Sequence, residues 1–291
     1  MGAGTLTASC YAVYNTSLGR EYDTTTHVIT GQTFEAKHID ASLDPAKFSV
    51  RECINTDEHP NTIPVILALD VTGSMGDACS ETAATLGKIV LNLYKKYQDI
   101  EFCIMGIGDL AYDKAPIQMS QFESDIRIAE SIDKIYIEHG GGGNAYESYT
   151  AAWYMGLYHT KLDCFDKQHR KGIIITMGDE PLNPYLPSDD LNASLGHKQF
   201  TDKDIETNAL YKNTKEKFDI YHIAVDSPYN CYNAYKDDIA NSFGQLLGKR
   251  LKISTIEKLS DTIEECISEA IDGISYEESS TNVNEKGEIH W

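Results

Sequence analysis

The chain has 291 residues, enough to bury one large hydrophobic core or two smaller ones. Hydrophobic residues make up 41% of it and aromatic residues 10%, which excludes a disordered polypeptide, and no apolar run is long enough to predict a transmembrane helix. The net charge of −20, with Lys and Arg spread thinly, makes nucleic acid and anionic membranes poor partners and favours cations.

The N-terminal sequence and the cysteines predict the cell compartment. The first residues show no basic segment followed by an apolar stretch, so we expect no signal peptide. The seven cysteines are scattered, odd in number and never spaced C-x-x-C, which favours reduced, mostly buried thiols over disulfides or a zinc site. The sequence therefore predicts a cytoplasmic protein.

Residues 1–60 differ in composition from the rest of the chain. They are rich in Thr, Ser and Tyr, and they contain two β-like fragments, at residues 11–14 and 27–29. We expect an N-terminal extension that carries a β-hairpin and packs on the edge of the sheet.

Four apolar runs follow, each ending at a polar residue or at a Gly-Asp pair and followed by helical sequence. They cover residues 63–69, 102–108, 172–177 and 218–225. Continuous apolar runs of this length are typical of strands buried on both faces. We therefore predict an α/β fold, a doubly wound, Rossmann-like and mostly parallel sheet with helices on both faces, over residues 61–275.

The last helix of this domain has apolar residues at helical spacing from Ile256 to Ile274. Ser254 and Glu257 form the pattern of a capping box at its start. The remaining residues, 276–291, are polar and acidic, and we expect a frayed tail.

Ligands of open α/β sheets bind at the carboxyl ends of the strands, so the residues there are the candidates for a site. Asp70, Thr72 and Ser74 alternate along the loop that leaves the first strand, and Asp179 follows the third. Carboxylate and hydroxyl oxygens are the ligands of Mg²⁺, Mn²⁺ or Ca²⁺ and not of zinc. A simpler alternative is that the hydroxyls are helix N-caps and Asp70 a turn residue. The second carboxylate and the glycine run at residues 140–143 favour the metal site. Glu180 is expected to point to solvent.

The segment from Asp70 to Met75 resembles the D-x-[S/T]-x-S signature of von Willebrand factor A-type (vWA) domains. The resemblance extends over residues 61–275 and implies a metal-ion-dependent adhesion site (MIDAS). In that family a Thr after a Gly-rich turn and an Asp after a later strand complete the metal site. Asp179 matches the second position, whereas Asn144 stands near the position of the Thr and would offer an amide oxygen. Magnesium is the implied ion, with Mn²⁺ or Ca²⁺ as alternatives.

The sequence is most similar to the bacterial and phage branch of the family, through Gly108-Asp109 and through Glu147 after the glycine run. Members of that branch are typically intracellular, and some resemble proteins that work beside kinases, phosphatases or AAA+ ATPases. Asp109, Asp113 and Glu147 are candidates for a second shell that hydrogen-bonds the metal ligands and waters. The alternative is that they are merely solvated acidic loop residues of an acidic protein.

These observations predict a divalent-metal-dependent protein-binding module, not an enzyme, in which an Asp or Glu of a protein partner completes the metal coordination. A Mg²⁺-dependent phosphotransfer enzyme or hydrolase is one alternative, but Thr72 stands where such chemistry usually needs a second acidic group. The other alternative is a structural assembly protein whose metal only fastens loops.

Overall fold

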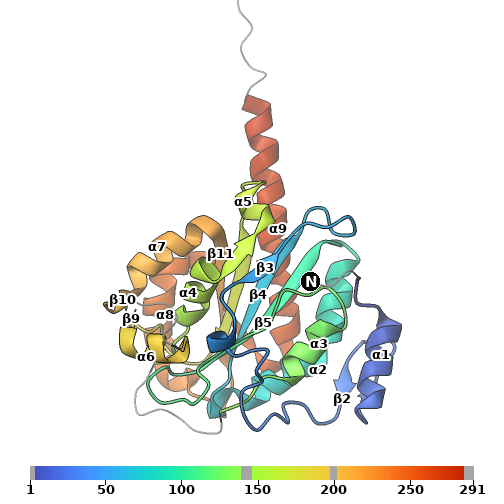
Figure 1. Ribbon diagram of the computed structural model, residues 1–291, viewed down its shortest axis with the longest axis horizontal. Coiled ribbons are helices and arrows are strands. Elements are labelled where there is room, and N and C mark those ends of the chain that lie inside the picture. Colours follow the sequence, from blue (N-terminus) through green and yellow to red (C-terminus); the bar gives the residue numbers. More distant parts are fainter. Residues whose placement is uncertain (1–3, 139–145, 197–201, 285–291) are drawn as a thin grey trace, which may run out of the picture.

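A six-stranded sheet forms the centre of the protein in a computed structural model, which describes residues 4–138, 146–196 and 202–284 (Figure 1). The strand order is β12-β11-β8-β4-β5-β6, and every neighbouring pair is parallel except β5 and β6. The strands are β4 (Ile63–Asp70), β5 (Ile100–Ile107), β6 (Ile117–Met119), β8 (Gly172–Gly178), β11 (Phe218–Asp226) and β12 (Leu251–Thr255). This arrangement confirms the predicted fold class and all four predicted buried strands.

Helices cover both faces of the sheet, which explains the uninterrupted apolar runs (Figure 1). Alternate residues of β4 point to opposite layers: Leu67 packs in one hydrophobic cluster and Ile66 in the other. The Leu67 layer contains α1 (Ala8–Ser17), α2 (Gly76–Tyr94), α3 (Arg127–Asp133) and α9 (Leu259–Asn284). The Ile66 layer contains α4 (Thr150–Tyr158), α5 (Asp163–Asp166), α6 (Ser188–Ser194), α7 (Thr207–Lys217) and α8 (Tyr232–Leu247).

The N-terminal segment packs on α2 and α3. Residues 11–14, expected to be β-like, lie within helix α1, so that expectation was wrong. Thr7 accepts a hydrogen bond from the Cys10 N–H as its N-cap, and the buried Tyr11 ring packs so closely on Gly87 of α2 that a Cβ there would overlap it. The guanidinium of Arg20 pairs with Asp133 of α3 at 2.6 Å.

Short strand pairs lie outside the central sheet. β1 (Glu21–Tyr22) and β2 (Ile29–Thr30) form an antiparallel pair, and β3 (Arg51–Cys53) runs parallel to β7 (Thr160–Leu162). β9 (Tyr185–Leu186) and β10 (Ile205–Glu206) form a third pair.

The start of the last helix differs from the prediction. Ser254 belongs to the edge strand β12, and its hydroxyl contacts the Thr262 hydroxyl at 2.9 Å instead of capping a helix. A 3₁₀ turn, Ile256–Lys258, intervenes, and α9 begins at Leu259. The predicted capping box is therefore wrong. Helix α9 also continues to Asn284, beyond residue 275, where the sequence analysis placed the end of the domain.

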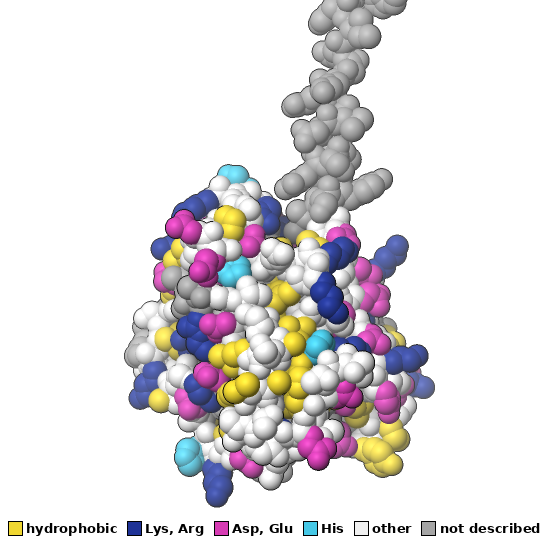
Figure 2. Space-filling view, turned by 90° about the vertical axis from the view of Figure 1, so that its right-hand side faces the viewer, with side chains coloured by type: hydrophobic (Ala, Val, Ile, Leu, Met, Phe, Trp, Pro, Cys, Tyr) yellow, Lys and Arg dark blue, Asp and Glu magenta, His cyan; other side chains and the backbone are white. Residues whose placement is uncertain are grey.

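The exposure of the cysteines and the distribution of charge can be compared with what the composition predicts. Five of the seven cysteines are buried, Cys231 is partly buried and Cys10 is exposed. Among the described helices, none is both long and apolar enough to cross a bilayer. On the face that carries α1, Lys and Arg side chains lie among acidic ones and do not gather into one patch (Figure 2).

Glu101, on β5, gives a prediction for the pH dependence of stability. It is 1% exposed, and burial raises its pKa from 4.5 to about 7, an effect that Cys53 and His59 only partly oppose. When folding raises the pKa of a carboxyl, its contribution to stability is fully present below the pKa of the unfolded state. The contribution is lost as the pH rises through the pKa of the folded state. Between pH 4.5 and 7 we expect wild type to lose up to about 3 kcal/mol relative to Glu101→Gln.

Urea unfolding at several pH values measures this difference. The exposed Glu35→Gln is the matched control, and its curve should run parallel to that of wild type. Parallel curves for Glu101→Gln and wild type would contradict the prediction.

Candidate functional site

The candidate site lies where the strand order reverses. From β4 the chain first adds β5 on one side and later returns to place β8 on the other side of β4. Asp70 is the last residue of β4, and Asp179 directly follows β8. Two neighbouring parallel strands therefore deliver one carboxylate each to the same crevice, the usual ligand position in such sheets.

The Asp70 carboxylate is fully buried and accepts three hydrogen bonds. Its Oδ1 accepts from the Thr72 backbone N–H at 3.0 Å and from the Thr72 hydroxyl at 2.6 Å. Its Oδ2 accepts from the Tyr149 hydroxyl at 2.7 Å. These bonds fix the carboxylate in one orientation at the end of the strand.

Ser74 connects the Asp70 loop to Asp179. Its hydroxyl lies 3.4 Å from the Thr72 hydroxyl and donates to Asp179 Oδ1 at 3.2 Å. Asp179 Oδ2 accepts from the Cys231 backbone N–H at 2.7 Å. Thr72 stands at the N-cap position of the 3₁₀ turn Gly73–Met75, but neither its side chain nor that of Ser74 makes a capping hydrogen bond. The structure thus gathers four predicted ligands, whereas Asn144 lies outside the described residues.

Asp109, Asp113 and Glu147, the residues predicted to form a second shell, differ in their hydrogen bonds. Asp113 Oδ2 accepts from the Asp109 backbone N–H at 2.7 Å, and Asp109 Oδ1 accepts from the Ala111 N–H at 2.8 Å. Asp109 Oδ2 and Glu147 Oε2 are buried and have no hydrogen-bond partner among the described residues. Asp109 and Glu147 are therefore buried carboxylates and not solvated loop residues.

Glu180 does not point freely to solvent as expected. It is partly buried, and its Oε2 is another buried oxygen without a hydrogen-bond partner among the described residues. Two residues further on, Leu182 forms an isolated parallel β-bridge with Glu147. Burial and the charges of Asp179 and Asp109 raise the pKa of Glu180 to about 7.

The carboxyls destabilise one another when all are ionised. Burial, followed by the charge of Asp179, raises the pKa of Asp70 to about 7. Burial and the charges of Asp70, Glu180, Asp113 and Asp109 raise the pKa of Glu147 to about 11. None of these carboxylates forms an ion pair with a Lys, Arg or His in the part of the chain that the structure describes. A bound cation would relieve this repulsion.

The donor set fits a hard divalent cation. Asp70 and Asp179 offer carboxylate oxygens, and Thr72 and Ser74 offer hydroxyls, the kind of ligand that Mg²⁺ and Ca²⁺ take. The described residues contain no group of three or more His, Cys, Asp or Glu that could hold a metal by themselves. The hydroxyls would therefore have to complete the coordination, and the buried, unpartnered oxygens of Glu147 and Glu180 would bind its waters.

Sequence reasoning missed Tyr149 and Cys231. Tyr149 is 1% exposed and comes from the start of α4, and Cys231 precedes α8 and contributes its backbone N–H. Cys231 follows the end of β11, so the rule that sites lie after strands could have found it. Tyr149 directly follows none of the described strands, so this rule does not mark it.

Comparison with known proteins identifies the fold. No protein-family model matches the sequence, and no curated protein does. Among solved structures, the pilus adhesin SpaC from Lactobacillus rhamnosus GG, in an open conformation, matches with a TM-score of 0.50 and 11% identity. The match covers 75% of this chain and 30% of the adhesin, so the chain spans less than a third of that protein.

Two weaker matches come from other pilus proteins. A D319A mutant of the PilB minor pilin from Streptococcus sanguinis has a TM-score of 0.45 and 14% identity, covering 74% of this chain and 63% of the pilin. The vWF domain of the type V pili tip protein Mfa5 from Porphyromonas gingivalis has a TM-score of 0.42 and 12% identity, covering 79% of this chain and 98% of that domain. The chain therefore shares its α/β fold, a mostly parallel sheet with helices on both faces, with the pilus adhesin SpaC.

Proposed function

We propose that the protein is a divalent-metal-dependent protein-binding module with a MIDAS-like site. Asp70, Thr72, Ser74 and Asp179 hold the ion, and a carboxylate from an Asp or Glu of a protein partner completes its coordination. The single observation that carries the proposal is the linked set of four oxygen side chains at the switch point of the sheet.

The charge distribution supports the same proposal. With a net charge of −20, the surface repels acidic partners, and a metal held at the Asp70 site would be a local exception. Such a site would select a partner by the position of one carboxylate, and like-charge repulsion would reject acidic proteins that do not place one there. The vWA-like fold, shared with a pilus adhesin, agrees with an interaction module.

Selection from a peptide library tests the proposal without a known partner. A displayed library of linear peptides is bound to the protein in Mg²⁺, washed, and eluted with EDTA. We expect the eluted peptides to share one Asp or Glu whose change to Asn or Gln abolishes binding. A surface coated with Asp70→Ala should recover none of them.

Two results would count against the proposal. Peptides that bind equally well in EDTA would show that the ion takes no part in recognition. Peptides that are recovered in Mg²⁺ but tolerate the loss of every acidic residue would show that no carboxylate reaches the ion.

A further inference from the structure

A pocket of about 320 Å³ lies beside the outer carboxylates of the candidate metal site. Asp109 and Ser148 connect the two, because the Ser148 hydroxyl accepts from the Leu110 N–H at 3.1 Å, and Ser148 follows Glu147 directly. The residues that give the pocket its chemistry are Asp109, Tyr146, Ser148, Asn183, Tyr185 and Asp190.

One buried acceptor in this pocket has no partner. Asp109 is 3% exposed, and its Oδ2 makes no hydrogen bond to any described residue. A buried carboxylate oxygen in that state is costly unless a ligand donates to it. No Lys or Arg is among the described residues that line the pocket, so none of those residues neutralises the Asp109 carboxylate.

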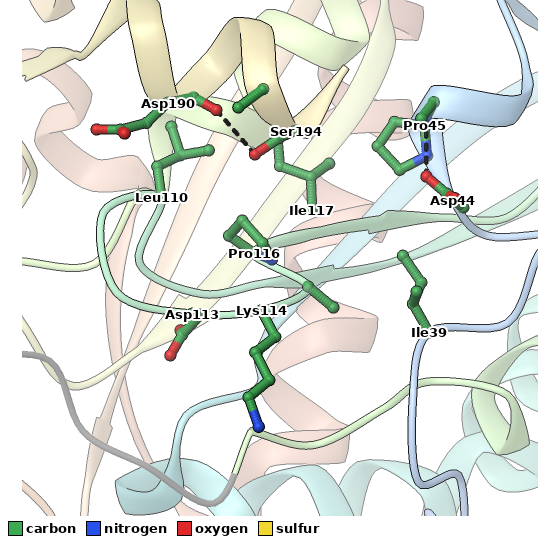
Figure 3. A pocket seen from close by; sticks show the side chains of 13 residues that line it. Ile39, Asp44, Pro45, Leu110, Asp113, Lys114, Pro116, Ile117, Asp190 and Ser194 are labelled. Carbon is green, nitrogen blue, oxygen red and sulfur yellow. Dashed lines mark hydrogen bonds between the residues drawn. The ribbon is translucent and has the colours of Figure 1, made fainter. Parts of the chain in front are cut away.

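Asp190, on α6, supplies a second carboxylate. It also borders a neighbouring pocket, shown in Figure 3, where its backbone carbonyl accepts from the Ser194 hydroxyl at 2.9 Å. In that view its carboxylate lies on the side away from Ser194 and Ile117. Burial and the charges of Asp189, Asp109 and Asp204 raise the pKa of Asp190. Asp190 and Asp109 line the same pocket, so it carries two carboxylates.

Two aromatic rings complete the pocket. Tyr146 is 43% exposed and Tyr185 is 44% exposed, and both line it together with Pro184 and Pro187. Cations bind favourably over tyrosine rings, and guanidinium and ammonium groups bind carboxylates through charge-assisted hydrogen bonds. The combination of two carboxylates and two rings therefore suits a cationic side chain.

We propose that this pocket receives an arginine or lysine side chain of the protein that binds at the neighbouring metal site. This inference rests on the proposed function in taking the ligand to be part of a protein partner. The partner then presents a carboxylate to the ion and, beside it, a positive charge to Asp109 and Asp190. Recognition requires both signs of charge in a fixed arrangement.

The probe is N-acetyl-arginine-N-methylamide, titrated into ¹⁵N-labelled protein in EDTA and followed by chemical shifts. We expect saturable binding with a dissociation constant on the order of 1 mM, and no binding of the uncharged norleucine analogue. Asp190→Asn should weaken binding about tenfold. Asp189→Asn is the matched control, because Asp189 is exposed and lines neither pocket, and it should weaken binding far less than Asp190→Asn does.

Equal effects of Asp190→Asn and Asp189→Asn, or the absence of saturation, would overturn the proposal. Because the titration is made without metal, its outcome is separate from that of the peptide selection. Arginine binding without any Mg²⁺-dependent peptide would refute the metal-dependent function and leave the pocket assignment intact. Peptides selected in Mg²⁺ that keep their affinity for Asp190→Asn would refute the pocket assignment alone.

Discussion

Asp70→Ala is expected to abolish stabilisation of the protein by Mg²⁺. In wild type, an ion present at about 100 times its dissociation constant should raise the free energy of unfolding by roughly 2.7 kcal/mol, which is a shift of a few degrees in Tm. Asp70 supplies one of only two carboxylates in the proposed ligand set, so its loss leaves the ion with one charged ligand. Thermal unfolding in EDTA and then in Mg²⁺, Mn²⁺ or Ca²⁺ measures the effect and ranks the ions.

Two further variants make this result interpretable. Asp70→Ala leaves the Thr72 and Tyr149 donors unpaired and can lower stability for that reason, so Asp70→Asn is measured beside it, since the amide oxygen still accepts hydrogen bonds. Asp77→Asn removes an exposed charge from the first turn of α2, close to the site in sequence, and should respond to Mg²⁺ as wild type does. Stabilisation of Asp70→Ala and Asp70→Asn by the same amount as wild type would refute the ligand assignment.

The central strands could be predicted because their sequence carries its own signal. A strand buried on both faces is mostly apolar, and the runs that become β4, β5, β8 and β11 are, with isolated polar residues such as Glu101, Thr176 and His222. The two edge strands carry no such signal. β6 has three residues, and in β12 only Ser254 is buried, so neither shows a continuous apolar run. Edge strands take their conformation from the strand beside them and not from their own hydrophobicity.

The N-terminal helix is a second case in which the local sequence does not predict the structure. Residues 11–14 are Tyr-Ala-Val-Tyr, a composition that favours a strand, yet they lie in α1. The contact of Tyr11 with Gly87 of α2 and the bond from the Tyr14 hydroxyl to Asp133 at 2.9 Å both come from distant parts of the chain. Tertiary packing overrides local propensity here, and no local pattern contains that information.

At the site, the sequence predicts which residues meet but not what surrounds them. Residues that end parallel strands share one edge of the sheet, and this rule brings Asp70 and Asp179 together. The orientation of Glu180 and the bond from Tyr149 to Asp70 depend on how the following segments fold back. Those details are set by packing between α4, α8 and the sheet, which strand-end reasoning does not address.

Gly178→Ala is expected to destabilise the protein by about 1–3 kcal/mol, the usual cost of overpacking a core. Gly178 is the last residue of β8, and a Cβ there would overlap the phenol ring of Tyr149. The ring cannot easily give way, because it packs against His222 with centroids 5.1 Å apart and against Phe243 at 5.8 Å. Chemical denaturation of wild type and variant measures the change.

A double-mutant cycle with Tyr149→Ala identifies the cause. If the overlap with the ring produces the loss, Gly178→Ala should cost at least about 1 kcal/mol less in the Tyr149→Ala protein than in wild type. Gly76→Ala is the control, because Gly76 opens helix α2 with free space around its Cα, and alanine there should be neutral or slightly stabilising. An equal cost of Gly178→Ala in both backgrounds would exclude the ring contact, and strand β8 itself would then be the part that does not tolerate a side chain.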